Sequence, residues 1–137
     1  MADCIFCKII AGELPSTKVY EDDQVLAFLD INPINYGHTL VIPKEHYETL
    51  VDLPDEELKE LMPVVKRIGQ VVMDSLGVDG FNIGLNNGKV AGQLVDHVHF
   101  HVIPREAGDG LKHWPSKDYE EGEMERIAQR VREALKK

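Results

Sequence analysis

The sequence lacks the features of a membrane or secreted protein. No apolar run approaches the roughly 20 residues that a membrane-spanning helix needs. The start MADCIFCKII has neither the basic residues nor the small-residue cleavage site of a secretory signal. There are only two cysteines, Cys4 and Cys7, and in a cytosolic protein a Cys-x-x-Cys spacing is more typical of a metal or redox pair than of a structural disulfide. We therefore expect a cytoplasmic protein that does not bind a membrane.

Basic residues are also scarce, because 15 Lys and Arg stand against 24 Asp and Glu and give a formal net charge of −9. Binding to a nucleic-acid polymer requires a basic surface, so this balance argues against a polynucleotide partner. A small phosphorylated ligand is still allowed, since a few local donors can hold it. The length of 137 residues suggests one domain, residues 1–137, around one hydrophobic core.

The spacing of apolar residues predicts helices and strands in alternating blocks. Residues 54–76 carry apolar side chains at intervals of three and four, with Gly77 just past the end. Pro63 lies inside this pattern and predicts a kink or a later helix start. The other elements are two helices at 4–11 and 119–135, two strands joined by an Asp22-Asp23 turn, and strands at 39–43, 81–86 and 95–103. Together they predict an α+β fold with a five-stranded antiparallel sheet, one long central helix and a C-terminal helix.

The stretch DHVHFHVIPR places three of the six histidines, His97, His99 and His101, at alternate positions. On a strand these three share one face, while the apolar residues between them point into the core. A solvated polar face explains one histidine but explains three in register poorly. The three could instead hold a catalytic zinc. Alternatively, one imidazole could attack phosphorus while a neighbour protonates the leaving group.

The loop just upstream, NNGKVAGQ, favours the attack on phosphorus. Its glycines, among them Gly92, let the backbone approach an anion closely, and the amides of Asn86 and Gln93 can donate to phosphoryl oxygens. Phosphoryl transfer depends mostly on positioning and charge stabilisation, which such a loop can supply. Beside the histidines, the loop therefore indicates a phosphoryl-transfer site.

These residues resemble a known family. The run HVHFHVI matches the histidine triad (HIT) signature His-φ-His-φ-His-φ-φ, where φ is apolar. CIFCKIIAGELPSTKVYEDDQVLAFLDINPINYGHTLVIPKEH is similar to the N-terminal half of that family, and AGQLVDHVHFHVIPR to its catalytic half. The chain looks closest to the branch that hydrolyses nucleoside phosphoramidates and dinucleoside polyphosphates. The resemblance also implies a homodimer in which two five-stranded sheets join into one, and no organic cofactor.

The resemblance implies a role for each matching residue. His99 would be the nucleophile that takes up a nucleoside monophosphate, and His101 would assist at the phosphate or leaving group. His38 matches a histidine near the triad. Asp30 would hold the ribose hydroxyls. The remaining implied contacts are Gln93 and Asn86, with Gly92 in the same loop, for the phosphate and leaving group, and Ile5, Phe6, Ile9 and Phe28 for the apolar wall of a base pocket.

One position departs from the family pattern. Many phosphoramidate-cleaving members have Ser directly after the Gln, where this chain has Leu94. A hydroxyl donor is then missing, which leaves the preferred leaving group open. A polyphosphate needs less protonation than an amine does on departure, so Leu94 slightly favours polyphosphate substrates.

A structural zinc is implied by some bacterial and archaeal members of similar layout. Cys4 and Cys7 supply two ligands, which do not close a tetrahedral site, and His46 and His97 are the candidates for the other two. The alternative is a pair of reduced thiols beside a surface histidine. If His97 binds zinc, the chemistry depends on His99 and His101.

Two other functions stay open at this point. One is a zinc-hydroxide hydrolase that uses all three histidines, and the other is a nucleotide sensor or scaffold with little turnover. Covalent catalysis sets a condition on the structure. The ring of His99 must be free to bond phosphorus, and burial against apolar neighbours or metal ligation would contradict it.

Overall fold

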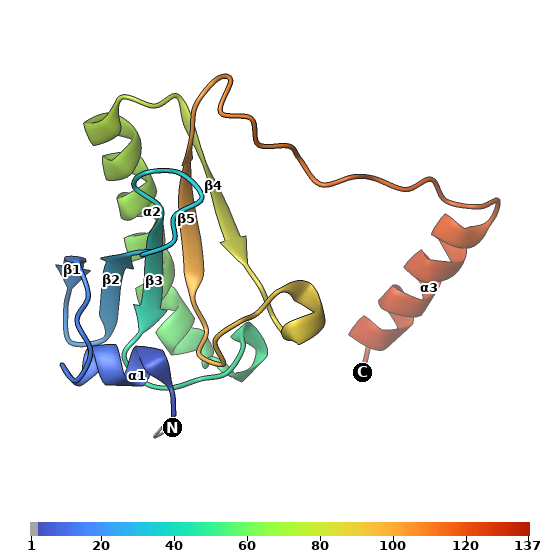
Figure 1. The fold of residues 1–137 in the computed structure, drawn as a ribbon. Coiled ribbons are helices and arrows are strands. Elements are labelled where there is room, and N and C mark those ends of the chain that lie inside the picture. The colour runs from blue at the N-terminus through green and yellow to red at the C-terminus, as the bar shows by residue number, and fades with distance from the viewer. Residues whose placement is uncertain (1–2) are drawn as a thin grey trace.

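Five antiparallel strands form one sheet, in the order β1-β2-β3-β5-β4. This computed structural model describes residues 3–137 (Figure 1). The strands are β1 (Lys18–Glu21), β2 (Val25–Leu29), β3 (Thr39–Pro43), β4 (Gly80–Leu85) and β5 (Phe100–Arg105), and the helices are α1 (Ile5–Ile10), α2 (Asp55–Leu76) and α3 (Glu123–Leu135). All four strand pairings are antiparallel. The predicted α+β class, the five-stranded sheet and the three helices are therefore confirmed.

α2 and α1 cover opposite faces of the sheet. α2 covers one face, where its Leu61, Val65 and Ile68 pack with alternate residues of β2, β3 and β5. α1 covers the other face, where Phe6 and Ile9 pack with the intervening residues of β2 and β3. Val98, Phe100 and Val102 belong to the α2 side, so the predicted apolar half of the histidine motif does point into the main core. The histidines face α1.

The last strand starts later than predicted, at Phe100 instead of residue 95. β3 pairs with β5 from Thr39 opposite Val102 to Val41 opposite Phe100. Continued, this ladder would set Ile42 opposite His99 and then Pro43, which has no N–H to donate, opposite Val98. The carbonyl oxygen of Pro43 lies 2.8 Å from Nε2 of His97 instead. The first two histidines therefore sit in a non-strand segment, and of the three only His101 is on the strand.

α2 begins and ends as the sequence predicts. Gly77 closes it with a φ of 68°, a left-handed conformation that glycine adopts without strain. The helix runs unbroken through Pro63, so the alternative of a later start is wrong. Pro63 is exposed, which lets water satisfy the carbonyl that has lost its partner.

The C-terminal helix starts at Glu123, four residues later than predicted, after Gly122 with a φ of 80°. Figure 1 shows α3 apart from the sheet, at the end of a long extended segment. One stripe of α3 stays exposed and consists of Met124, Ile127, Val131 and Leu135. No helix within residues 3–137 is both long and apolar enough to cross a membrane.

Candidate active site

The ring of His99 presents a nitrogen lone pair that solvent can reach. Nδ1 lies 2.7 Å from the carbonyl oxygen of His97. A carbonyl oxygen can only accept, so Nδ1 carries the proton and Nε2 the lone pair. Within residues 3–137, every fully buried side-chain nitrogen or oxygen has a hydrogen-bond partner. Among these residues Nε2 of His99 has no hydrogen-bond partner, so it is not fully buried, although His99 as a whole is only 6% exposed.

The surroundings of this ring are partly apolar. Phe6 lies edge-on against the His99 imidazole, with ring centroids 5.1 Å apart. The solvated polar face, which explained three histidines in register poorly, is excluded for His97 and His99, which are 0% and 6% exposed. The ring as a whole is buried against Phe6, which the condition on the nucleophile excluded, but the reactive Nε2 is not fully buried. The carbonyl oxygen of His97 contacts the other ring nitrogen, Nδ1.

A chain of hydrogen bonds fixes the protons of His38 and His101. The backbone N–H of Ile34 donates to Nδ1 of His38 at 3.1 Å, so the proton of His38 lies on Nε2. The Nε2–H of His38 in turn donates to Nδ1 of His101, 2.9 Å away. Nδ1 of His101 must therefore accept, and its own proton lies on Nε2. His38, 2% exposed, orients His101 so that its Nε2–H can donate outside this chain of bonds.

Burial keeps these imidazoles neutral. It lowers the pKa of His38 and of His99, where the Asp30 carboxylate opposes it in part. It lowers the pKa of His97 and of His101 to about 4, and neighbouring histidines add to the effect in both. Near neutral pH, His99 is then an uncharged nucleophile and His101 an uncharged hydrogen-bond donor.

Gln93 is placed differently from the prediction. It is 3% exposed, and its amide is fully used within the chain. Nε2 donates to the carbonyl oxygens of Glu48 at 2.6 Å and Val95 at 3.1 Å, while Oε1 accepts from the backbone N–H of Gly88 at 2.7 Å. An amide NH₂ group has two hydrogens. Gln93 therefore has none left for a phosphate and acts as a brace of the 86–93 loop.

The other predicted contacts lie around the histidines. The Asp30 carboxylate is 3.7 Å from Nε2 of His38. Asn86 donates weakly to the carbonyl oxygen of Gly92, which has a φ of 96°. Of the four residues predicted for the base pocket, three are buried in the α1-side cluster and Ile5 is half-exposed. Leu94 is 92% exposed and supplies no donor.

The four predicted metal ligands do meet. The ligand atoms of Cys4, Cys7, His46 and His97 all lie within 4.8 Å of one another. Nδ1 of His97 is 3.5 Å from Cys4 Sγ and 3.7 Å from Cys7 Sγ, and Nδ1 of His46 is 3.3 Å from Cys7 Sγ. In a tetrahedral zinc site, sulfur and nitrogen ligands stand about 3.6 Å apart. The donor set and its spacing fit zinc, and Nδ1 of His97 is unprotonated because Nε2 donates to Pro43.

The thiol of Cys7 is a poor nucleophile without a cation beside it. Burial, followed by the contact with Cys4, raises the pKa of Cys7 to about 11. A thiol of this kind ionises at neutral pH only beside a positive charge, and a bound metal ion supplies one. The pair is therefore better suited to hold a metal than to react.

The three histidines of the motif do not converge on one ion. In the described part of the chain, the second group with ligand geometry is Asp30, His38 and His101. Nε2 of His38 already carries a proton there, because Nδ1 accepts from Ile34. The zinc-hydroxide hydrolase built on His97, His99 and His101 is therefore not supported.

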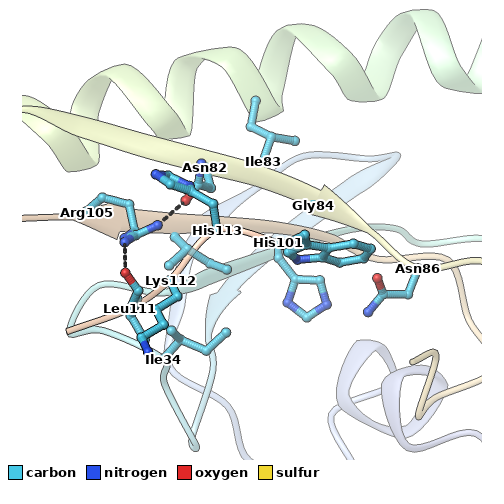
Figure 2. Close-up of a pocket in the computed structure, with 12 residues that line it drawn as sticks. Ile34, Asn82, Ile83, Gly84, Asn86, His101, Arg105, Leu111, Lys112 and His113 are labelled. Carbon is cyan, nitrogen blue, oxygen red and sulfur yellow. Dashed lines mark hydrogen bonds between the residues drawn. The ribbon is translucent and has the colours of Figure 1, made fainter. Parts of the chain in front are cut away.

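The sequence did not predict a cavity that lies beside His101. It measures about 460 Å³ and lies between β4, β5 and the segment that follows β5 (Figure 2). Lys112 and His113 from this segment line it, together with Asn86. Figure 2 also shows Arg105 bonded to Asn82 and to the backbone of Leu111. The signal in the sequence was His113, a further histidine that follows the motif and lines this cavity.

Comparison with known proteins agrees with this geometry. The HIT domain matches residues 11–108. An uncharacterised HIT-like protein of Methanocaldococcus jannaschii is 62% identical over 107 residues, covering 78% of this chain and 82% of that protein. Adenosine 5'-monophosphoramidase of Saccharomyces cerevisiae is 49% identical over 119 residues, covering 85% and 73%. The crystal structure of a zinc-bound histidine triad family protein from Mycobacterium smegmatis superposes with a TM-score of 0.77 at 41% identity, covering 98% of each chain. The chain belongs to the histidine triad family.

Proposed function

We propose that the protein is a nucleotide hydrolase or transferase that acts on the α-phosphate of nucleoside phosphoramidates or dinucleoside polyphosphates. The family includes a relative named as an adenosine 5'-monophosphoramidase, which supports nucleotide hydrolysis at the family level. The observation that carries the proposal here is the lone pair on Nε2 of His99, which the bond from Nδ1 to the His97 carbonyl sets in place.

The reaction has two steps. Nε2 of His99 attacks the α-phosphorus and forms a P–N bond, while the bond to the leaving group breaks and its electron pair departs with that group. An amine leaving group also takes up a proton from water as it departs, whereas a polyphosphate leaves as an anion. The ring then carries a positive charge, which the carbonyl oxygen of His97 stabilises at the Nδ1–H. Water next attacks the same phosphorus, the P–N bond breaks towards His99, and a nucleoside monophosphate and a proton are released. His101 Nε2–H stabilises the negative charge that develops in each step.

We propose a structural zinc held by Cys4, Cys7, His46 and His97. Zinc with four protein ligands has no open position, so it would supply folding free energy and no chemistry. The zinc-bound relative and the ligand distances support this site. Because the carbonyl oxygen of His97 also accepts the hydrogen bond from Nδ1–H of His99, the metal would fix the backbone that orients the nucleophile.

A homodimer and a cytoplasmic location complete the proposal. The sheet ends in β4, an edge strand on which Ile83 is 46% exposed. Edge strands readily pair with a second chain. The bare apolar stripe of α3 also supports an assembly of more than one chain. Sedimentation of a monomer at micromolar concentration would contradict the dimer.

Rapid quench with ³²P-labelled adenosine 5'-phosphoramidate tests the covalent step. We expect an acid-labile, base-stable adduct that peptide mapping places on His99. His99→Asn should lose the adduct and at least about 10³-fold in kcat, with an unchanged melting temperature. Full activity of His99→Asn would exclude the mechanism. A nucleotide sensor would instead bind the monophosphate tightly, and its background turnover would not respond to the substitution.

A further inference from the structure

The cavity beside His101 has an unusual composition for so acidic a protein. The chain carries a net charge of −9, yet none of the residues that line the cavity is Asp or Glu. The polar and charged lining residues are His101, Asn86, Asn82, Arg105, Lys112 and His113. A volume of about 460 Å³ lies within the range of small-molecule sites. The cavity therefore suits an anion better than a cation.

Lys112 is the free positive charge of this cavity. Arg105 is paired with Asp109, with Nε 2.8 Å from Oδ2, so its charge is largely neutralised. Within residues 3–137, no carboxylate oxygen lies within 4.0 Å of Lys112 Nζ, unlike Nζ of Lys18, Lys44 and Lys59. Arg105 also donates to the carbonyl oxygen of Leu111, which holds the backbone just before Lys112 (Figure 2).

The cavity lies where the leaving group of the proposed reaction would depart. The family resemblance implies that Asp30 and Phe28 contact the nucleoside, and both lie at the end of β2, outside the lining of this cavity. His101 lies in its wall. In a phosphoryl transfer, the attacking and leaving atoms are roughly in line on opposite sides of phosphorus. A leaving group displaced by His99 towards His101 and Asn86 would enter this cavity.

The protonation of His101 restricts the kind of leaving group. Its Nδ1 accepts from the Nε2–H of His38 at 2.9 Å, so the ring holds a single proton, on Nε2. It can donate a hydrogen bond from there, but giving the proton away would leave an imidazolate. An amine has to gain a proton to leave, whereas a phosphate or polyphosphate leaves as an anion.

We propose that this cavity receives an anionic leaving group, a phosphate or polyphosphate chain, and that Lys112 binds it. The inference rests on the proposed function, because it assigns the leaving group of the same displacement. It makes dinucleoside polyphosphates better substrates than phosphoramidates of bulky amines. Lys112 thus contributes to specificity and does not take part in bond making.

A comparison of two substrates tests the inference. The first is a dinucleoside tetraphosphate, whose leaving group would fill the cavity. The second is adenosine 5'-phosphoramidate, whose leaving group is ammonia and is too small to reach Lys112. Lys112→Gln should lower kcat/KM for the tetraphosphate about tenfold and leave kcat/KM for the phosphoramidate within about twofold. Lys66→Gln is the matched control, because Lys66 lies on α2 over the opposite face of the sheet. It should change neither value.

The outcomes separate the two proposals. An equal effect of Lys112→Gln on both substrates, an equal effect of Lys66→Gln, or an unaffected tetraphosphate would overturn the leaving-group site. Hydrolysis of the phosphoramidate without hydrolysis of the tetraphosphate would overturn it as well. In each of these cases the adduct on His99 stands. Failure of the adduct itself removes the proposed function, and the leaving-group site with it.

Discussion

Replacing Gln93 should destabilise the fold, although the family resemblance implies a role for this residue at the substrate. The side chain makes three hydrogen bonds, to Glu48, Val95 and Gly88, and is 3% exposed. Gln93→Met keeps the length of the side chain and removes all three bonds. At about 1 kcal/mol net per neutral hydrogen bond, the free energy of unfolding should fall by about 3 kcal/mol. For a chain of this size, that corresponds to a melting temperature lower by roughly 10 °C.

Urea unfolding followed by circular dichroism measures this change. The matched control is Gln70→Met, because Gln70 bonds only to Asp74 on the exposed side of α2. That variant should change the free energy of unfolding by less than about 0.5 kcal/mol. A Gln93→Met protein that unfolds like wild type but has lost activity would refute the reasoning. It would show that the amide turns to the substrate and does not brace the 86–93 loop.

Three further predictions follow from the histidines and thiols. We expect elemental analysis to find about one zinc per chain in the wild-type protein and none in Cys7→Ser, which should also have a lower melting temperature because zinc binding adds to folding free energy. A metal-free wild-type protein after gentle purification would contradict this. kcat/KM should stay level from about pH 6 to 8 and fall as pH drops towards 4, because burial lowers the pKa of His101 to about 4 and its neutral form is needed. The free energy of unfolding should also decrease below about pH 6.5, since the unfolded chain then binds protons that the folded chain does not; a pH-independent unfolding midpoint would exclude a buried neutral His101.

Local pattern predicted a large part of this fold. The apolar residues of α2 recur every three or four positions, and Val98, Phe100 and Val102 recur every second position. Both patterns arise because one face of each segment is buried in the same core, so the spacing in the sequence is enough to predict them. The four proposed zinc ligands, predicted by resemblance, meet in space, and whether a metal binds them stays a prediction. The division of the chain into a single domain also stays a prediction.

What the sequence could not reveal depends on contacts between distant segments. The late start of β5 goes with contacts to distant residues, since Val98 N–H donates to the Tyr47 carbonyl and His97 Nε2 to the Pro43 carbonyl. The partner of Gln93 at Glu48 lies 45 residues away, and nothing in NNGKVAGQ indicates that the amide is already used. Lys112 lines the cavity beside His101, next to the backbone that Arg105 binds at Leu111. Neither propensity nor periodicity records such pairings.

The shortness of α1 has a consequence for how the enzyme fails. A helix of six residues is unstable in isolation, so its attachment to the rest of the chain holds it in place. Phe6 stands on this helix between the two thiols and touches the rings of both His97 and His99. Heating or chelation should detach this N-terminal turn first, while the sheet and α2 persist. Catalysis would then cease at a temperature where spectroscopy still reports a folded molecule.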